Sequence, residues 1–428
     1  MISRRNALKL LGTIPAGYYL QSILACSNEK EFQRQLGASL YKSTGTNIPQ
    51  ITQNLLESLG GIQSLIDKDD IVVLKPNAQW WLQGMTNTDV MSEFITQVLS
   101  IPGFKGEIII ADNHQDKVPD SRGWNTDQPN GKFNYNDLVR YFNGSGFPNV
   151  TKYHWTPAGP NPTPLMLQGS GDSVVTHPSE GDGYIWPKDL FYECPYGNKC
   201  LLSYPVFTSS YSGVTIDLKD GAFKDGSYTG QPIKFINFSA INHHGRYTGV
   251  TASIKNFMGV VDMTCGYPSP NPDGHFNTHH IGASYIFRLL ADRQKTLQDV
   301  PFYWDARYHP SVFRFKYTGG VLGKFMKTIR SADLNIITAI NIGWGSRTDT
   351  AMAANTNTVL ASTDPVALDY WAAANVLLPA TKKAGAAESY IELNDPNIED
   401  GPMRKFLEEC RRELGGTIEP ELISIIES

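Results

Sequence analysis

Residues 241–259 read INHHGRYTGVTASIKNFMG and follow directly on an apolar run at 235–241. The stretch gathers two histidines, an arginine, a lysine and three glycines in one short segment. Protein cores rarely hold lysine or arginine, whereas glycine-containing loops with basic and amide side chains let the backbone approach an anionic ligand. The stretch therefore predicts a buried strand that leads into a ligand-binding loop and a short helix.

Apolar runs like the one at 235–241 recur along the chain. Short runs rich in β-branched residues are typical of buried parallel strands, and predicted helices separate several of them. The sequence therefore predicts an α/β fold with a mainly parallel sheet and flanking helices. The predicted strands lie at 71–74, 108–111, 235–241, 334–340 and 359–361, and the predicted helices at 51–66, 89–99, 135–142, 253–261, 281–292 and 365–377.

The chain of 428 residues is long enough for one large domain or two ordinary ones. Residues 47–378 are predicted to form the α/β domain. Within it, 143–232 is dense in Pro, Gly, Asn and Tyr, which predicts a long loop-rich insertion with short antiparallel strands. Residues 379–428, with a predicted helix at 403–414, are expected to form a C-terminal helical appendage.

The start of the chain is predicted to export and tether the protein. A twin-arginine pattern, SRRNALK, precedes a modest apolar segment, so residues 1–26 are interpreted as an export signal. The signal ends in ILAC, which resembles a lipobox in which Cys26 carries the lipid; the alternative is a plain cleavable signal with an incidental cysteine. Residues 27–46 are predicted to be a polar tether. We expect a periplasmic or cell-envelope protein that is anchored to the membrane by lipid.

Charge and cysteine content exclude some classes of partner and cofactor. The net charge is -5 and the basic residues are scattered, so we expect no nucleic-acid partner. Cys194 and Cys200 enclose turn residues and could form a disulfide in an oxidising compartment, with a metal site as the alternative. No Cys-x-x-Cys run is present, so no iron–sulfur cluster is expected. The oligomeric state is left open.

Polar side chains follow the predicted strands at the point where each strand ends. Parallel strands bring their carboxyl ends to one edge of a sheet, and ligands of α/β proteins bind at that edge. We therefore expect a small anionic ligand there. The candidate ligand-binding residues are Lys75, Asn77, Asp112, His114, Asn256 and Asp364, and the candidate catalytic residues are His244 and Lys255.

Two of these candidates have structural alternatives. Lys75 ends a buried strand, so its ammonium needs either an anionic ligand or a salt bridge to Asp112 or Asp364. Asp364 precedes Pro365, a pair typical of the start of a helix, so capping is favoured over catalysis for Asp364.

The central stretch holds the remaining basic candidates. His243 and His244 are adjacent in extended backbone and point to opposite faces, and we expect His244 to serve the site. Lys255 and Asn256 would lie in the first turn of a helix capped by Thr251 or Ser253, where free backbone N–H groups attract an anion. The alternative for Lys255 is a solvated helix face.

A second histidine cluster offers a metal site. His275 and His279 would share one face of a helix, a spacing that can hold a transition metal, if the helix begins by Gly274. The alternative is a later helix start and a polar, hydrogen-bonded role for these histidines.

Three segments resemble, in this order, the domain of unknown function 362 family: VLKPN at 73–77, TGVTASIKNFMG at 248–259 and LASTDPVALD at 360–369. The resemblance covers roughly 70–377 and implies architecture more than activity. Family members often have Lys-Thr-His where this chain has Asn242-His243-His244, and an Asp where it has Thr338. Some also carry ferredoxin-type cysteine clusters, which this chain lacks.

The leading hypothesis is an enzyme that binds a small anionic ligand or a metal or organic cofactor. Lys75 and Lys255 would neutralise the anion, Asn77 and Asn256 would orient it, and His244 would act as general acid or base. A distant similarity of the layout to nickel-pincer lactate racemase implies redox or isomerase chemistry. The alternative is a non-catalytic surface protein that binds carbohydrate or peptide through its aromatic insertion. The aromatic residues of that alternative are Trp80, Trp81, Trp124, Trp155 and Trp186.

Overall fold

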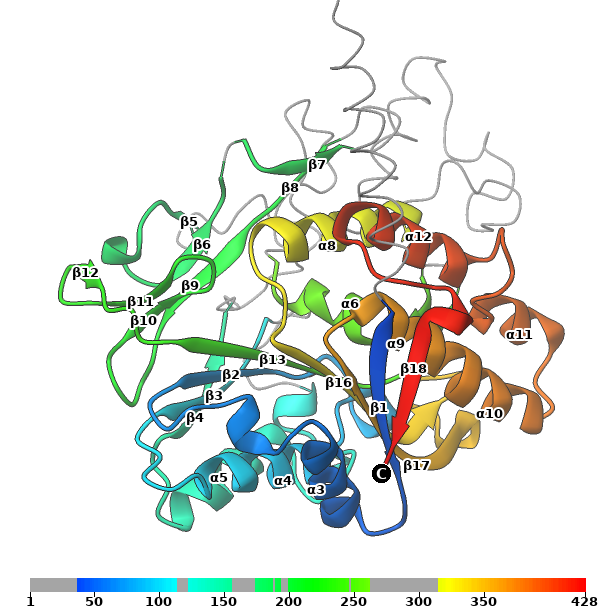
Figure 1. The fold of residues 1–428 in the computed structure, drawn as a ribbon, viewed down its shortest axis with the longest axis horizontal. Helices are drawn as coiled ribbons and strands as arrows, with labels where there is room; N and C mark the ends of the chain where they lie inside the picture. Colours follow the sequence, from blue (N-terminus) through cyan, green and yellow to red (C-terminus); the bar gives the residue numbers. More distant parts are fainter. Residues whose placement is uncertain are drawn as a thin grey trace, which may run out of the picture.

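The computed structural model describes residues 37–113, 122–155, 174–187, 189–193, 199–245, 248–261 and 315–428. These residues form a mainly parallel sheet with helices on both faces and a smaller second sheet (Figure 1). The predicted α/β fold class is confirmed. The predictions for Cys26, His114, Cys194, His275 and His279 concern residues outside the described ranges.

The main sheet contains all five predicted strands. Its strands are β1 (Ala38–Thr44), β2 (Ile71–Lys75), β3 (Glu107–Asp112), β4 (Val150–His154), β13 (Ile233–Ser239), β16 (Leu334–Gly343), β17 (Ala353–Ser362) and β18 (Ile423–Glu427). They lie in the order β18-β1-β17-β16-β13-β2-β3-β4. In this order only β17 runs against the others, because it is antiparallel to both of its neighbours, β1 and β16. A short pair, β14 (Asn242–Gly245) and β15 (Gly249–Thr251), joins the sheet beside β16.

Helices cover both faces of this sheet (Figure 1). One face packs against α3 (Ile48–Ser58), α4 (Thr88–Leu99) and α5 (Tyr135–Gly144), and the other against α6 (Ser253–Asn256), α8 (Phe315–Thr328), α9 (Pro365–Ala372) and α12 (Pro402–Leu414). Successive side chains of a strand point to opposite faces, so Val72 and Val73 of β2 enter different cores. Burial on both faces explains why the predicted strands are continuous apolar runs.

The predicted insertion forms the second sheet, in the order β12-β11-β10-β9-β6-β5, and a separate hairpin, β7–β8. The strands are β5 (Val174–Val175), β6 (Gly183–Ile185), β7 (Phe191–Glu193), β8 (Lys199–Leu201), β9 (Tyr204–Thr208), β10 (Thr215–Asp217), β11 (Gly221–Lys224) and β12 (Ser227–Tyr228). All their pairings are antiparallel except β5 with β6. The insertion begins later than predicted, because β4 pairs with β3 and so belongs to the main sheet.

The two ends of the described chain differ from the predicted tether and appendage. β1 lies within the predicted tether, yet it pairs with β17 and β18 and buries Leu40 completely. The C-terminal segment supplies α10 (Leu378–Lys383), α11 (Glu388–Asn394) and α12, but it also supplies β18 at the edge of the sheet. β1 (ASLYKST) is mostly polar, which is why it resembles a tether.

Two predicted helices are shorter than expected. α3 ends at Ser58, and Gly60 and Gly61 follow with φ of 94° and 84°, a backbone region that favours glycine. The helix predicted at 253–261 consists of α6 and a 3-10 turn, Phe257–Gly259. No helix in the described ranges combines the length and apolarity that a membrane span requires.

Asp364 caps α9 and does not belong to the ligand edge. Its side chain accepts hydrogen bonds from the backbone N–H groups of Val366 (2.9 Å), Ala367 (3.0 Å) and Thr417 (3.0 Å). Because β17 is antiparallel, its last residue, Ser362, pairs near the start of β16 and lies at the opposite edge from the ends of β2 and β3. The predicted ligand-binding role of Asp364 is therefore wrong, and the capping alternative is correct.

Candidate functional site

A polar pocket lies where β2 and β3 end, beside α6 and the loop that follows β16. It is partly open to solvent rather than a closed cavity. The lining residues are Lys75, Asn77, Gln79, Trp80, Asp112, Asn113, His244, Thr251, Lys255, Asn256, Gly259 and Arg347. Six of the eight residues predicted for the site are among them; His114 lies outside the described residues and Asp364 lies elsewhere.

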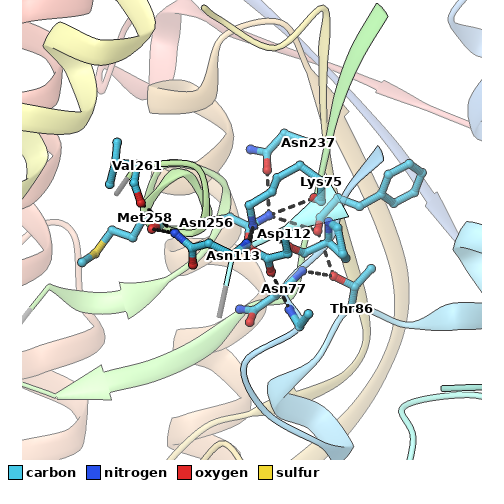
Figure 2. Close-up of polar contacts among 12 residues, drawn as sticks. Lys75, Asn77, Thr86, Asp112, Asn113, Asn237, Asn256, Met258 and Val261 are labelled. Atoms are coloured by element: carbon cyan, nitrogen blue, oxygen red, sulfur yellow. Dashed lines mark hydrogen bonds and ion pairs between the residues drawn. The ribbon is translucent and has the colours of Figure 1, made fainter. Parts of the chain in front are cut away.

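Lys75 and Asp112 form a buried ion pair on the inner wall of this pocket (Figure 2). Lys75 Nζ lies 2.9 Å from Asp112 Oδ1, and the side chains are 1% and 4% exposed. The ammonium also donates to the carbonyl oxygen of Pro76 (2.6 Å) and to Asn256 Oδ1 (3.1 Å). An ammonium has three donors, and all three are engaged. The structure therefore favours the ion-pair alternative for Lys75 over direct contact with a ligand.

Asp112 is held by backbone donors as well as by Lys75. The N–H of Ala78 donates to Oδ2 (3.0 Å) and the N–H of Asn113 donates to Oδ1 (2.8 Å). Burial raises the pKa of Asp112 to about 6, while the ammonium and the N–H groups oppose that rise. Gly259 lies against this pair, and a Cβ at Gly259 would overlap both Asp112 Oδ1 and Lys75 Nζ.

We expect Gly259→Ala to lower the free energy of unfolding by about 1–3 kcal/mol, because the methyl group overpacks a buried ion pair. Gly144→Ala is the matched control: Gly144 lies in α5 and a Cβ there meets no atom within 4 Å. The control should be neutral or stabilising, since alanine favours helix. Thermal and urea unfolding measure the stability of the two variants. Equal unfolding midpoints for Gly259→Ala and Gly144→Ala would contradict the close packing at Gly259.

Asn256 joins α6 to the strands and leaves no free side-chain group for a ligand. Its Nδ2 donates to Asn237 Oδ1 (2.7 Å), to the carbonyl oxygen of Lys75 (3.1 Å) and to that of Phe238 (3.2 Å), while its Oδ1 accepts from Lys75. Asn256 was predicted to orient the ligand. In the structure it orients Lys75 and fixes the end of α6 against β2 and β13.

The N-terminus of α6 is occupied by a carboxylate from another helix. Asp369 of α9 accepts hydrogen bonds from the N–H of Ser253 (2.8 Å), from its hydroxyl (2.5 Å) and from the N–H of Ile254 (2.9 Å). No side chain of Thr251 or Ser253 caps the helix, contrary to the prediction. Burial raises the pKa of Asp369 to about 7, and its hydrogen bonds oppose that rise. An external anion therefore cannot use these N–H groups.

Lys255 differs from Lys75 although both are buried. It is 7% exposed, which contradicts the solvated-face alternative, and it lines the pocket. Within the described part of the chain, no residue forms an ion pair or hydrogen bond with its ammonium. Burial, together with the positive charges of Arg347 and Lys75, lowers the pKa of Lys255 to about 7.

Arg347 supplies a further positive charge that the sequence did not indicate. Its guanidinium lies 4.5 Å from the ring centre of Trp80, and the guanidinium of Arg122 lies 4.4 Å from the same ring. Burial and the nearby Arg122 lower the pKa of Arg347 to about 10. Across the described residues, no carboxylate pairs with Arg347.

His244 and His243 point in different directions. His244 lines the pocket, and its Nδ1 lies 2.7 Å from the hydroxyl of Thr251. His243 Nδ1 lies 2.7 Å from Asn394 Oδ1, and its ring packs against Tyr390. His244 is thus the histidine that faces the candidate site.

Asn77 is fixed through its backbone. The N–H donates to the hydroxyl of Thr86 (2.8 Å) (Figure 2). The carbonyl oxygen accepts from the hydroxyl of Tyr135 (2.9 Å). The described residues provide no hydrogen-bond partner for its carboxamide, which lines the pocket. Asn77 can therefore donate to a ligand.

Other predicted features lie apart from this pocket or outside the described residues. No group of three or more His, Cys, Asp or Glu side chains that could hold a metal is found in the described ranges. Cys200 is buried in β8, and the predicted disulfide stays a prediction because Cys194 is not described. Of the five tryptophans predicted to recognise carbohydrate or peptide, Trp124 and Trp155 are buried in the core and cannot stack on a ligand.

Residues 233–374 match the family model described as Domain of unknown function (DUF362). The match runs from β13 through α9 and so includes His244, Lys255 and Asp369, whereas Lys75 and Asp112 precede it. Comparison with curated proteins and with solved structures found no match.

Two departures from the family pattern have structural roles here. The hydroxyl of Thr338 accepts from the N–H of Asn87 (2.9 Å) and donates to the carbonyl oxygen of Ser239 (3.1 Å). Asn242 Oδ1 accepts from the N–H of Gly343 (2.7 Å). Thr338 thus joins the middle of β16 to the end of β13, and Asn242 joins β14 to the end of β16.

Proposed function

We propose that this chain, which belongs to the DUF362 family through residues 233–374, binds a small organic anion in the pocket where β2 and β3 end. The excess of positive charge supports this most directly. Lys255 and Arg347 line the pocket without a carboxylate partner in the described ranges, and the one carboxylate among the lining residues is engaged by Lys75. Buried charge is costly unless it is paired, so an anionic ligand would compensate it.

The roles of the lining residues follow from which of their side-chain groups are not already engaged by other residues of the protein. Lys255 and Arg347 neutralise the anion, and the carboxamide of Asn77 donates to it. His244, steadied by Thr251, acts as general acid or base. Lys75 and Asn256 act indirectly, because they hold Asp112 and α6 in place.

We expect the wild-type protein to bind oxalate, a small dianion, in titration calorimetry at constant ionic strength. Lys255→Met and Arg347→Met should each weaken binding about ten- to a hundredfold, as expected for loss of one hydrogen bond between charged groups. Lys105→Met is the control, because Lys105 is exposed and precedes β3 at the other end of the strand. Equal affinities of the wild type and Lys255→Met would rule out this site.

The affinity for oxalate should fall as pH rises above about 7. The anion favours the ammonium form of Lys255, whose pKa is lowered to about 7, so above that pH binding must also take up a proton. The loss approaches about tenfold per pH unit. The other ionisable groups around Lys255 are Lys75, Asp112, His244 and Arg347.

The variant Lys255→Arg distinguishes the titration of Lys255 from the titration of these neighbours. Its guanidinium stays charged. Any contribution of Lys75, Asp112, His244 and Arg347 is common to both proteins. The affinity of the arginine variant should therefore change less between pH 7 and about 9 than that of the wild type, and parallel curves would refute the assignment to Lys255.

We further propose that the ligand is met in the cell envelope, because the twin-arginine pattern and the lipobox predict export and a lipid anchor. Mass spectrometry of the mature protein from its own host should detect a lipidated Cys26 as the first residue. A mature chain that begins elsewhere, with Cys26 removed or unmodified, would contradict the anchor.

A further inference from the structure

We propose that Lys255 is a nucleophile that forms an imine with a small 2-oxo acid, whose carboxylate is held by Arg347. This inference rests on the proposed anion site and deepens it, because it names the class of ligand and a reaction.

The two buried lysines of the pocket have opposite surroundings. Lys75 has three acceptors, including the carboxylate of Asp112, which stabilise its charge. Lys255 has no partner in the described part of the chain, and the nearby charges, Lys75 and Arg347, are positive. Such surroundings favour the neutral amine, the form that attacks a carbonyl. Near pH 7 both forms of Lys255 are populated, so the same side chain can pair with an anion and react as an amine.

The lining of the pocket restricts the ligand. Two cationic side chains, Lys255 and Arg347, line the pocket together with Asn77. A ligand with a carboxylate next to a carbonyl can therefore place each of these two groups against a different cationic side chain. The carboxylate matches the planar, fork-shaped donor set of a guanidinium.

Arg347 is positioned to hold that carboxylate. Its stacking on Trp80, which also contacts Arg122, restrains the guanidinium at the pocket. Arg347 and Lys255 line the same pocket and influence each other electrostatically. One group can therefore hold the acid while the other reaches the neighbouring carbonyl carbon.

The reaction balances without an oxidant or a further reactant. The lone pair of the neutral Lys255 amine attacks the carbonyl carbon, a C–N bond forms, and the C=O π bond opens to a carbinolamine. The C–O bond then breaks and the C=N bond forms, and the oxygen leaves as water with the two protons that the amine nitrogen has lost. His244 lines the pocket and relays these protons from nitrogen to oxygen.

Reductive trapping tests the inference. The full-length protein is incubated with pyruvate and sodium borohydride, and peptide mass mapping then locates the reduced adduct. We expect one adduct on Lys255, suppressed by excess oxalate, strongly reduced in Arg347→Met and retained in Lys105→Met. Lys255→Arg should lose the adduct. Because the adduct is located on the wild-type protein, the assignment to Lys255 does not depend on whether this variant folds.

The possible outcomes separate this inference from the anion site on which it rests. A trapped adduct on Lys255 that oxalate suppresses supports both. Oxalate binding without an adduct, or adducts spread over exposed lysines with Lys255 unmodified, overturns the imine and leaves the anion site standing. Absence of both oxalate binding and adduct overturns both.

Discussion

The buried ion pair of Lys75 and Asp112 is the interaction on which the candidate site depends. Loss of either partner would leave an uncompensated charge and cost about 3–5 kcal/mol, so the segments that meet here depend on both side chains. Asn256 ties Lys75 to α6, backbone N–H groups hold Asp112, and Gly259 allows the chain to pass close by. The ion pair thereby joins two neighbouring strands to the segment that carries Lys255.

Strand direction explains both the success and the main failure of the sequence-based prediction. Polar residues after apolar runs could be assigned to one edge of the sheet because most strands are parallel, and Lys75, Asp112 and His244 do line one pocket. The run before Asp364 has the same composition, yet its strand, β17, is antiparallel and ends at the far edge. The composition of an apolar run indicates that a strand is buried on both faces, but it does not indicate the direction in which the strand runs. That direction depends on how the chain returns to the sheet.

Contacts between distant residues could not be predicted either. Asp369 caps α6 from a helix more than a hundred residues away in sequence, and Arg347 reaches the pocket by stacking on Trp80. No local pattern marks these partners. The two pocket lysines illustrate the same limit, because each was predicted to neutralise an anion, and only their surroundings distinguish a paired ammonium from an unpaired one.

The pairing of β1 with β17 and β18 has a consequence for the order of folding (Figure 1). A ribosome releases β1 long before it releases β17 or β18, so neither pairing of β1 can form until its partner strand has been made. Such pairings between distant parts of the sequence slow folding and are unavailable to a growing chain. This edge of the sheet therefore forms late, and β1 and β18 become ordered together.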